Sequence, residues 1–278
     1  MISFDFDYYQ PCSIAEAVSL YHQLLAAGKL PIYYAGGTEI ISMARMNQLF
    51  TKAVIDIKTI PECNVLHVEG SKLVIGSAVT LTQIEESNLF PLLSEVSKRT
   101  ADRTSRNKMT IGGNISGKLM YRETVLPFLL ADSQLVIAGN NGFKTVSIHE
   151  AFNERLHLQS GEILVQLITE QSYSTLPFKT VKKTKQSAID YPLLTLAALK
   201  KDGQIRAAFS GVCRFPFRLT EIEKEISQNQ MVVDERIDRA LKLFPAPILD
   251  DIQGSKEYRE FVLRNTLVEI IEWLEGVS

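Results

Sequence analysis

The sequence predicts an α+β protein with at least two domains. Helical periodicity dominates near both ends of the chain, and short β segments joined by tight turns fill the region between them. The length of 278 residues also exceeds the roughly 100 to 200 residues of a usual single domain. Two glycine-rich segments, at 35–39 and 110–114, stand apart from this pattern as candidate ligand-binding turns.

The first predicted element is an amphipathic helix over 14–25, which Ser13 caps and Gly28 ends. An extended segment over 30–34 then leads into the first glycine turn, and a short helix over 40–45 follows that turn. Such a helix would aim its N-terminal N–H groups at the turn.

The middle of the chain contains most of the predicted strands. They cover 54–57, 65–68, 72–76, 135–138, 143–146 and 163–168, with hairpin turns at 69–71 and 140–142. The Asn-Gly pair in the second hairpin suits a mirror-image turn. Helical segments are predicted near 80–99 and 122–131, and the second glycine turn lies between them.

A polar segment at 172–177 marks a further boundary. Beyond it, strands over 193–199 and 204–212 form a hairpin that turns at Asp202-Gly203, and helices follow to the end. The last helix is predicted to begin after the cap Ser255 and to end before Gly276. Its predicted buried face contains Tyr258, Phe261, Val262, Val268, Ile271 and Leu274.

The overall charge excludes some partner classes. Thirty basic and 32 acidic side chains leave a net charge of -2, which gives no electrostatic basis for binding nucleic acid or an anionic membrane. The N-terminus lacks the basic and apolar regions of a signal peptide, and no segment reaches the roughly 18 apolar residues of a membrane span. The predicted location is therefore cytoplasmic.

Common catalytic and metal-binding patterns are missing from the sequence. Cys12, Cys63 and Cys213 form no C-x-x-C pair, and the four histidines lie far apart, so no metal site is predicted. The dinucleotide fingerprint, the P-loop and the G-x-S-x-G nucleophile turn are also absent. We therefore predict binding residues in this chain and no catalytic acid, base or nucleophile.

The two glycine segments are the remaining functional candidates. Paired glycines permit positive φ and expose backbone N–H groups, and Thr38, Glu39, Thr110 and Asn114 add polar side chains beside them. A single Gly-Gly pair is more often plain turn geometry than a ligand site. Because this chain has two such pairs, each beside polar side chains, the sequence favours a phosphate-bearing cofactor held between the two segments.

Both segments resemble known motifs. Residues 31–39, Pro-x-x-x-Ala-Gly-Gly-Thr-Glu, and 106–115, Arg-Asn-Lys-Met-Thr-Ile-Gly-Gly-Asn-Ile, are similar to the two FAD-binding loops in the flavin subunit of molybdenum hydroxylases. That family includes the medium subunits of xanthine dehydrogenase and carbon monoxide dehydrogenase. Further similar segments lie at 75–80, 161–164, 178–179, 209–212 and 250–259. The resemblance thus covers nearly the whole chain.

The resemblance implies a fold and a domain order. A two-subdomain FAD-binding domain of the vanillyl-alcohol-oxidase/xanthine dehydrogenase flavin type would come first, with subdomains at 1–60 and 61–172. A smaller α+β domain, an antiparallel sheet with helices, would follow at 173–278.

The resemblance also implies which residues contact FAD. In the two motifs they are Tyr33, Tyr34, Ala35, Gly36, Gly37, Thr38, Glu39, Ile40, Thr110, Ile111, Gly112, Gly113 and Asn114. Glu123 takes the place of the family's Asp, within Met-Tyr-Arg-Glu rather than the usual Pro-x-Ser-Asp, and keeps a carboxylate there. Leu164 and Lys179 are further candidates, with a core strand residue and a solvated lysine as the alternatives.

In function, such a subunit resembles an electron relay. FAD would collect electrons that a molybdopterin-containing subunit takes from the substrate and that two-iron two-sulfur clusters of another subunit pass on. This chain is too short to include a molybdenum domain, and its cysteines do not form an iron–sulfur cluster pattern. The resemblance therefore implies a heteromeric complex. Xanthine dehydrogenase is the leading comparison, which makes purine the leading substrate; other aromatic heterocycles, aldehydes and carbon monoxide stay open.

The acceptor of the electrons is also open. A basic run at 180–186 replaces the acidic residues that follow this motif in animal xanthine dehydrogenases, so NAD or another acceptor would fit. Two other functions stay as alternatives: a stand-alone flavin-dependent reductase, and a subunit that has lost flavin and assists assembly. The first needs a substrate pocket with a proton donor, which the sequence does not nominate. The retained glycines, threonines and asparagine argue against the second.

Overall fold

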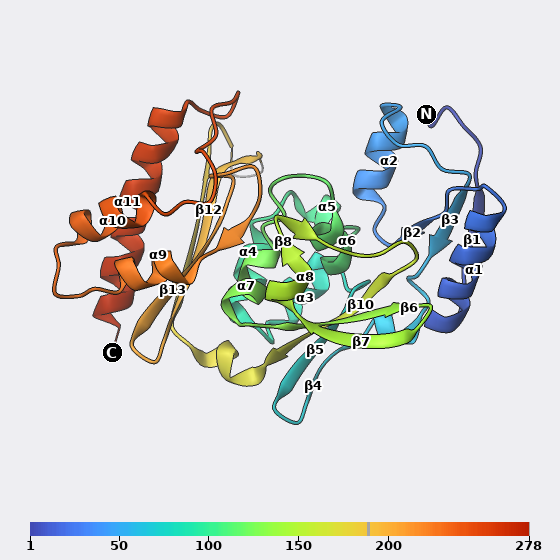
Figure 1. Cartoon of the computed structure of the whole chain (residues 1–278), viewed down its shortest axis with the longest axis horizontal. Coiled ribbons are helices and arrows are strands. Elements are labelled where there is room, and N and C mark those ends of the chain that lie inside the picture. Colours follow the sequence, from blue (N-terminus) through green and yellow to red (C-terminus); the bar gives the residue numbers. More distant parts are fainter. Residues whose placement is uncertain (188–189, 278) are drawn as a thin grey trace.

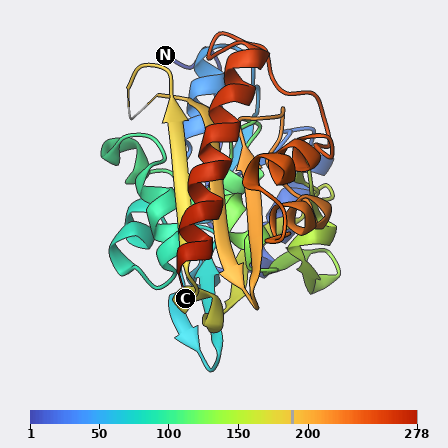
Figure 2. The same cartoon turned by 90° about the vertical axis from the view of Figure 1, so that its left-hand side faces the viewer.

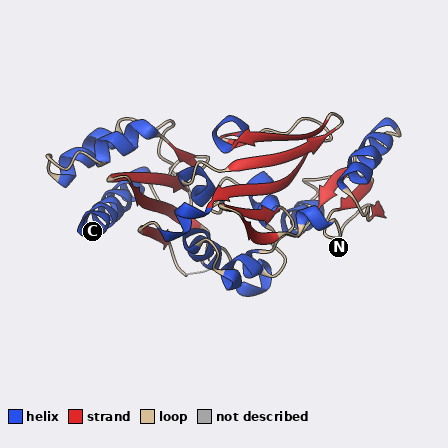
Figure 3. Cartoon of the chain, turned by 90° about the horizontal axis from the view of Figure 1, so that it is seen from below, coloured by secondary structure: helices blue, strands red, loops and turns tan. Residues whose placement is uncertain are grey.

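The computed structural model describes residues 1–187 and 190–277. Three sheets follow one another along the long axis of the molecule, and the two termini lie toward opposite ends of it (Figure 1). Seen from below, helices lie beside and between these sheets (Figure 3). Within the described residues, no helix combines the length and apolar character that crossing a bilayer requires.

The first sheet is a small parallel sheet. Its strands, in spatial order, are β1 (Asp7–Tyr9), β3 (Ala53–Asp56) and β2 (Ile32–Tyr34). Parallel neighbours need crossover connections, which α1 (Ile14–Ala26) and α2 (Thr38–Arg45) supply. The predicted first helix is confirmed, with the Ser13 hydroxyl accepting the N–H of Glu16 as its cap. The helix after the glycine turn begins at Thr38 rather than at residue 40.

The second sheet is antiparallel and has five strands. In spatial order they are β4 (Leu66–Glu69), β5 (Lys72–Gly76), β10 (Ile163–Glu170), β6 (Gln134–Gly139) and β7 (Gly142–Ser147). Both predicted hairpins are confirmed, although the turn of the second is not of the predicted mirror-image type. Gly139 pairs with Gly142 across a loop of two asparagines, and Gly142 is the residue with positive φ (+85°).

Short helices and connections surround this sheet. They are a 3-10 turn at Pro61–Cys63, α3 (Leu81–Ser87), α4 (Pro91–Lys98), α5 (Arg103–Arg106), α6 (Ile111–Ser116), α7 (Val125–Leu130), α8 (Ile148–Ala151) and the small pair β8 (Phe152–Asn153) and β9 (Arg155–Leu156). The helix predicted near 80–99 is therefore two helices. Asn88 ends α3 in the left-handed conformation, and Pro91 opens α4.

The third sheet is antiparallel and is covered on both faces. After a 3-10 turn at Gln171–Thr175 its strands are β11 (Phe178–Thr184), β12 (Pro192–Lys201), β13 (Gln204–Ser210) and β14 (Phe217–Arg218). Helices α9 (Thr220–Ile226), α10 (Val233–Leu241) and α11 (Lys256–Gly276) follow them. Figure 2 shows α11 lying along one face, and α4 and α7 contact the strands from the middle of the chain. The predicted hairpin at 193–212 is confirmed.

The predicted buried face of the last helix is partly wrong. Ile271 and Leu274 are buried, but Tyr258 and Phe261 are 54% and 63% exposed. The face of α11 that the structure buries comprises Arg259, Leu263, Thr266, Leu267, Ile270, Ile271 and Leu274. Two polar residues on that face, Arg259 and Thr266, concealed its helical spacing in the hydrophobic pattern.

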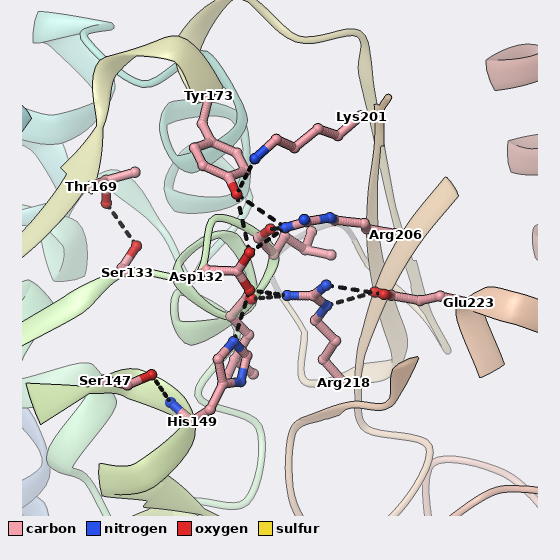
Figure 4. Close-up of polar contacts among 12 residues, drawn as sticks. Asp132, Ser133, Ser147, His149, Thr169, Tyr173, Lys201, Arg206, Arg218 and Glu223 are labelled. Atoms are coloured by element: carbon pink, nitrogen blue, oxygen red, sulfur yellow. Dashed lines mark hydrogen bonds and ion pairs between the residues drawn. The ribbon is translucent and has the colours of Figure 1, made fainter. Parts of the chain in front are cut away.

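Asp132 joins the middle of the chain to the third sheet. Its carboxylate, which follows α7, accepts hydrogen bonds from Arg206 and Arg218, each at 2.6 Å, and from the Tyr173 hydroxyl at 3.1 Å (Figure 4). His149 Nε2 lies 2.9 Å from the same carboxylate. Burial raises the pKa of Asp132, but the hydrogen bond to His149 and the charges of the two arginines outweigh it and hold the pKa well below its usual range.

We expect Asp132→Asn to destabilise the protein at neutral pH and to destabilise it less in acid. A depressed pKa contributes stability that is full above the unfolded value near 3.8 and is lost as pH falls toward the folded value. Since the side chain is 43% exposed, screening holds the cost at pH 7 to about 1 to 2 kcal/mol. Urea denaturation at pH 7 and pH 3 measures this difference, with the exposed Asp5→Asn as control. Equal differences at both pH values would contradict the assignment.

Candidate functional site

The fold brings the two glycine motifs into direct contact. Gly36 packs closely on Lys108 and Met109 of the second motif. A Cβ on Gly36 would lie 1.9 Å from the carbonyl oxygen of Lys108 and 3.2 Å from Cα of Met109. Only a residue without a side chain permits this approach. Gly36 therefore joins two parts of the chain that are distant in sequence.

Glu39 makes a second connection between the motifs. One carboxylate oxygen accepts the backbone N–H of Lys118 at 2.8 Å, and the other accepts that of Leu119 at 3.3 Å. Lys118 and Leu119 follow α6, which carries the second motif. The start of α2 and the end of α6 are thus held together by a charge-assisted pair of hydrogen bonds.

The first motif exposes a row of backbone donors. Gly37 is the N-cap of α2 and has the left-handed conformation, with φ of +70°. Within the described part of the chain, the N–H groups of residues 36–40 have no hydrogen-bond acceptor. Consecutive free N–H groups at a helix N-terminus bind anions, because the helix dipole adds to their partial charges.

Lys58 adds a cation that the sequence reasoning missed. Its Nζ lies 3.2 Å from the carbonyl oxygen of Ala35 and 4.4 Å from the centroid of the Tyr34 ring. The buried Asp56 holds the ammonium at 2.5 Å. No local pattern marks this lysine, because its place beside the first motif depends on the pairing of β3 with β2.

The second motif is a helix rather than an open turn. Residues of α6 use their N–H groups inside the protein: Ile111 donates to Val79, Gly112 to Ser77, Gly113 to the Thr110 hydroxyl and Asn114 to the Thr110 carbonyl. Neither glycine has positive φ. The prediction of free N–H groups in this segment is therefore wrong, because Thr110 caps a helix there.

Packing explains the glycine at position 112. A Cβ on Gly112 would lie 2.5 Å from Cβ of Ser77 and 2.8 Å from its carbonyl oxygen, so the motif rests directly on the backbone at the end of β5. The amide oxygen of Asn114 accepts the hydroxyl of Thr124 at 2.6 Å. These contacts hold the second motif against the end of β5 and the start of α7.

The two tyrosines of the first motif have different environments. The Tyr33 hydroxyl donates to the Gly161 carbonyl at 2.9 Å, and its ring stacks on Tyr21 at 5.1 Å. Burial raises the pKa of Tyr33 above its usual range, so the hydroxyl stays protonated. The ring of Tyr34 lies under Gly37, where a Cβ would come within 2.3 Å of it.

Three predicted residues lie outside this pair of motifs. Glu123 is buried and forms an ion pair with Lys182 at 3.1 Å, and it also accepts the Thr195 hydroxyl at 3.3 Å. Leu164 is a core residue of β10, 3% exposed. Lys179 pairs with Glu269 of α11 at 2.9 Å, on the face of the third sheet that α11 covers.

Glu123→Gln is expected to lower the free energy of unfolding by about 3 kcal/mol, because it leaves the buried ammonium of Lys182 without its charge partner. Urea denaturation measures the change. Adding Lys182→Met should restore most of the loss, since the uncompensated charge is then removed as well. If the double variant is no more stable than Glu123→Gln, the ion pair with Lys182 is not the source of the stability that Glu123 contributes.

Comparison with known proteins gives consistent matches. Residues 4–169 match the family described as FAD binding domain in molybdopterin dehydrogenase. The sequence is 25% identical over 295 residues to the nicotinate dehydrogenase FAD-subunit of Eubacterium barkeri, covering 98% of both chains. It is 32% identical over 173 residues to the carbon monoxide dehydrogenase medium chain of Hydrogenophaga pseudoflava, covering 60% of this chain and 59% of the other.

The fold also matches a solved structure. Reconstituted carbon monoxide dehydrogenase from Oligotropha carboxidovorans contains a chain that aligns over 100% of both chains with a TM-score of 0.86 at 22% identity. The predicted α+β class, with an antiparallel C-terminal sheet and its helices, is confirmed by this likeness.

Proposed function

The chain belongs to the family of FAD-binding medium subunits of molybdenum hydroxylases, and we propose that it acts as the electron-transfer subunit of such an oxidoreductase. In this role it accepts electrons from a partner subunit and passes them to a separate acceptor. The alignment with a nicotinate dehydrogenase FAD-subunit along almost its whole length supports this role.

The observation that carries the proposal is the row of free N–H groups at residues 36–40. FAD contains a diphosphate, and these donors and the positive end of α2 fit its negative charge. Gly37 leaves the backbone open to such a group, and Lys108 and Met109, just before α6, support the first motif at Gly36. When bound, the flavin ring of FAD accepts and releases the electrons. The residues of this chain hold and orient the cofactor.

The names of the relatives support a proposal for the partners and the substrate. The relatives are named as single subunits of larger enzymes: a FAD-subunit, medium chains, a medium subunit and a subunit beta. The names of those enzymes specify nicotinate, carbon monoxide, glyceraldehyde, caffeine or nicotine as the substrate. We propose a complex with a molybdenum-cofactor subunit and an iron–sulfur subunit that oxidises an aromatic nitrogen heterocycle, with purines tested first. NAD or another acceptor would receive the electrons, in the cytoplasm.

The domain limits are also a proposal. We place them at 1–60, 61–172 and 173–278, and the support is that each of the three main sheets falls within one of these ranges.

The experiment begins with the purified chain and its visible spectrum. A yellow protein whose extracted flavin has the mass of FAD supports the proposal. A folded protein that stays colourless after incubation with excess FAD contradicts it and favours the flavin-free assembly subunit. Purification from the native host then separates the electron-transfer subunit from a stand-alone reductase, because only the former copurifies with molybdenum and iron–sulfur partners. Hypoxanthine, xanthine and nicotinate, each with NAD and with a dye, test the substrate and the acceptor.

A further inference from the structure

Arg122 is a buried arginine between the end of α6 and the β8–β9 pair. It is 7% exposed and has a left-handed backbone, with φ of +36°. One terminal nitrogen donates to the Glu154 carbonyl at 2.7 Å, and the other donates to the Gly117 carbonyl at a long 3.5 Å. The buried Nε has no hydrogen-bond partner among the described residues. Its donors are therefore only partly used by the protein.

The charge of Arg122 is only partly compensated, by the nearby charge of Glu39 and by the Phe152 ring, whose centroid lies 5.6 Å from its guanidinium carbon. No carboxylate in the described part of the chain forms an ion pair with it. Glu39 is close enough to act on it, but both oxygens of that carboxylate are occupied by the N–H groups of Lys118 and Leu119. Burial lowers the pKa of Arg122, and the charge of Glu39 offsets part of that effect. A buried cation that lacks a direct ion-pair partner favours an added anion in its environment.

Arg122 is linked to the Glu39 side chain, which belongs to the first turn of α2. Gly117, whose carbonyl it contacts, is itself packed on Glu39, since a Cβ there would lie 2.8 Å from a carboxylate oxygen. Glu39 belongs to the row of residues with free N–H groups. Through Gly117 and Glu39, the partly paired guanidinium is thus connected to the residues that carry the free backbone donors.

We propose that Arg122 is a binding residue that supplies positive charge to the phosphates of the bound flavin nucleotide. The proposal rests on the proposed function. The hydrogen bonds that Arg122 makes within the protein do not explain why a buried arginine is present at this position, and phosphate binding would explain it. Guanidinium suits this task, because it keeps its charge when buried and offers several donors to phosphate oxygens.

The test compares flavins with and without phosphate. The full chain is freed of flavin, and the dissociation constants of FAD and riboflavin are measured by fluorescence in wild type, Arg122→Gln and Arg122→Lys. We expect Arg122→Gln to weaken FAD about tenfold and to leave riboflavin unchanged, because riboflavin lacks phosphate. Arg122→Lys should restore part of the affinity. Arg155→Gln, an exposed neighbouring charge, is the matched control and should change neither constant.

Two results separate the proposals. If wild type binds FAD and the FAD-to-riboflavin preference of Arg122→Gln equals that of wild type, the role of Arg122 is wrong while the proposed function stands. If wild type binds no FAD at all, the proposed function fails and this role fails with it. Should Arg122→Gln not fold, the same preference measured in Arg122→Lys decides, because a structural role alone would leave that preference unchanged.

Discussion

Gly36→Ala is expected to yield a protein that retains about a tenth or less of the wild-type FAD and unfolds about 3 kcal/mol more easily. The added methyl carbon would lie 1.9 Å from the carbonyl oxygen of Lys108, and no side-chain rotation can relieve a clash with backbone. The two motifs must move apart, which displaces the free N–H groups at the start of α2. Flavin content per folded protein and urea denaturation measure the two effects.

Gly276→Ala is the matched control, because Gly276 has ordinary φ and no atom within 4 Å of the added carbon. It should leave both flavin content and stability unchanged. A Gly36→Ala protein that purifies with a full complement of FAD would show that close contact between the motifs is not needed for binding.

The sequence was a good guide to where the motifs lie and a poorer guide to what their glycines do. Paired glycines, a hairpin Asn-Gly and helix caps are local signals, so the motifs, the hairpins and the first helix could be predicted from neighbouring residues. The sequence suggested that the glycines make room for a cofactor. In the structure, Gly36 and Gly112 make room for the protein chain itself, at Lys108 and Ser77, a role that the sequence did not indicate. Such contacts depend on segments that are distant in sequence.

The same limit applies to the weaker site residues. Position within a motif nominated Glu123 and Lys179, but their partners, Lys182 and Glu269, lie on elements whose packing no local pattern reveals. Two basic residues that the structure brings near the first motif were missed in the sequence. Lys58 and Arg122 were not nominated, because a single basic residue in a strand end or loop carries no spacing signal.

Arg259→Met is expected to cost about 3 to 5 kcal/mol of stability, the largest loss from any single side chain considered for this protein. Arg259 is fully buried in α11. Its guanidinium donates to the carbonyls of Leu193 and Gly211, the latter at 2.7 Å, to that of Leu249 at 3.1 Å, and to the Asp251 carboxylate at 2.6 Å. Methionine fills a similar volume and satisfies none of these acceptors, so α11 would lose its hydrogen bonds to the ends of β12 and β13 and keep only its apolar packing on the sheet.

Arg259→Lys should rescue little of this loss, because one ammonium cannot reach acceptors that a planar guanidinium contacts on several sides. Arg264→Met is the control on the same helix: its side chain is 38% exposed and pairs with Asp238, so we expect a cost below about 1 kcal/mol. Thermal and urea unfolding compare the three variants. Equal losses for Arg259→Met and Arg264→Met would show that the buried hydrogen bonds of Arg259 do not hold α11 to the third sheet.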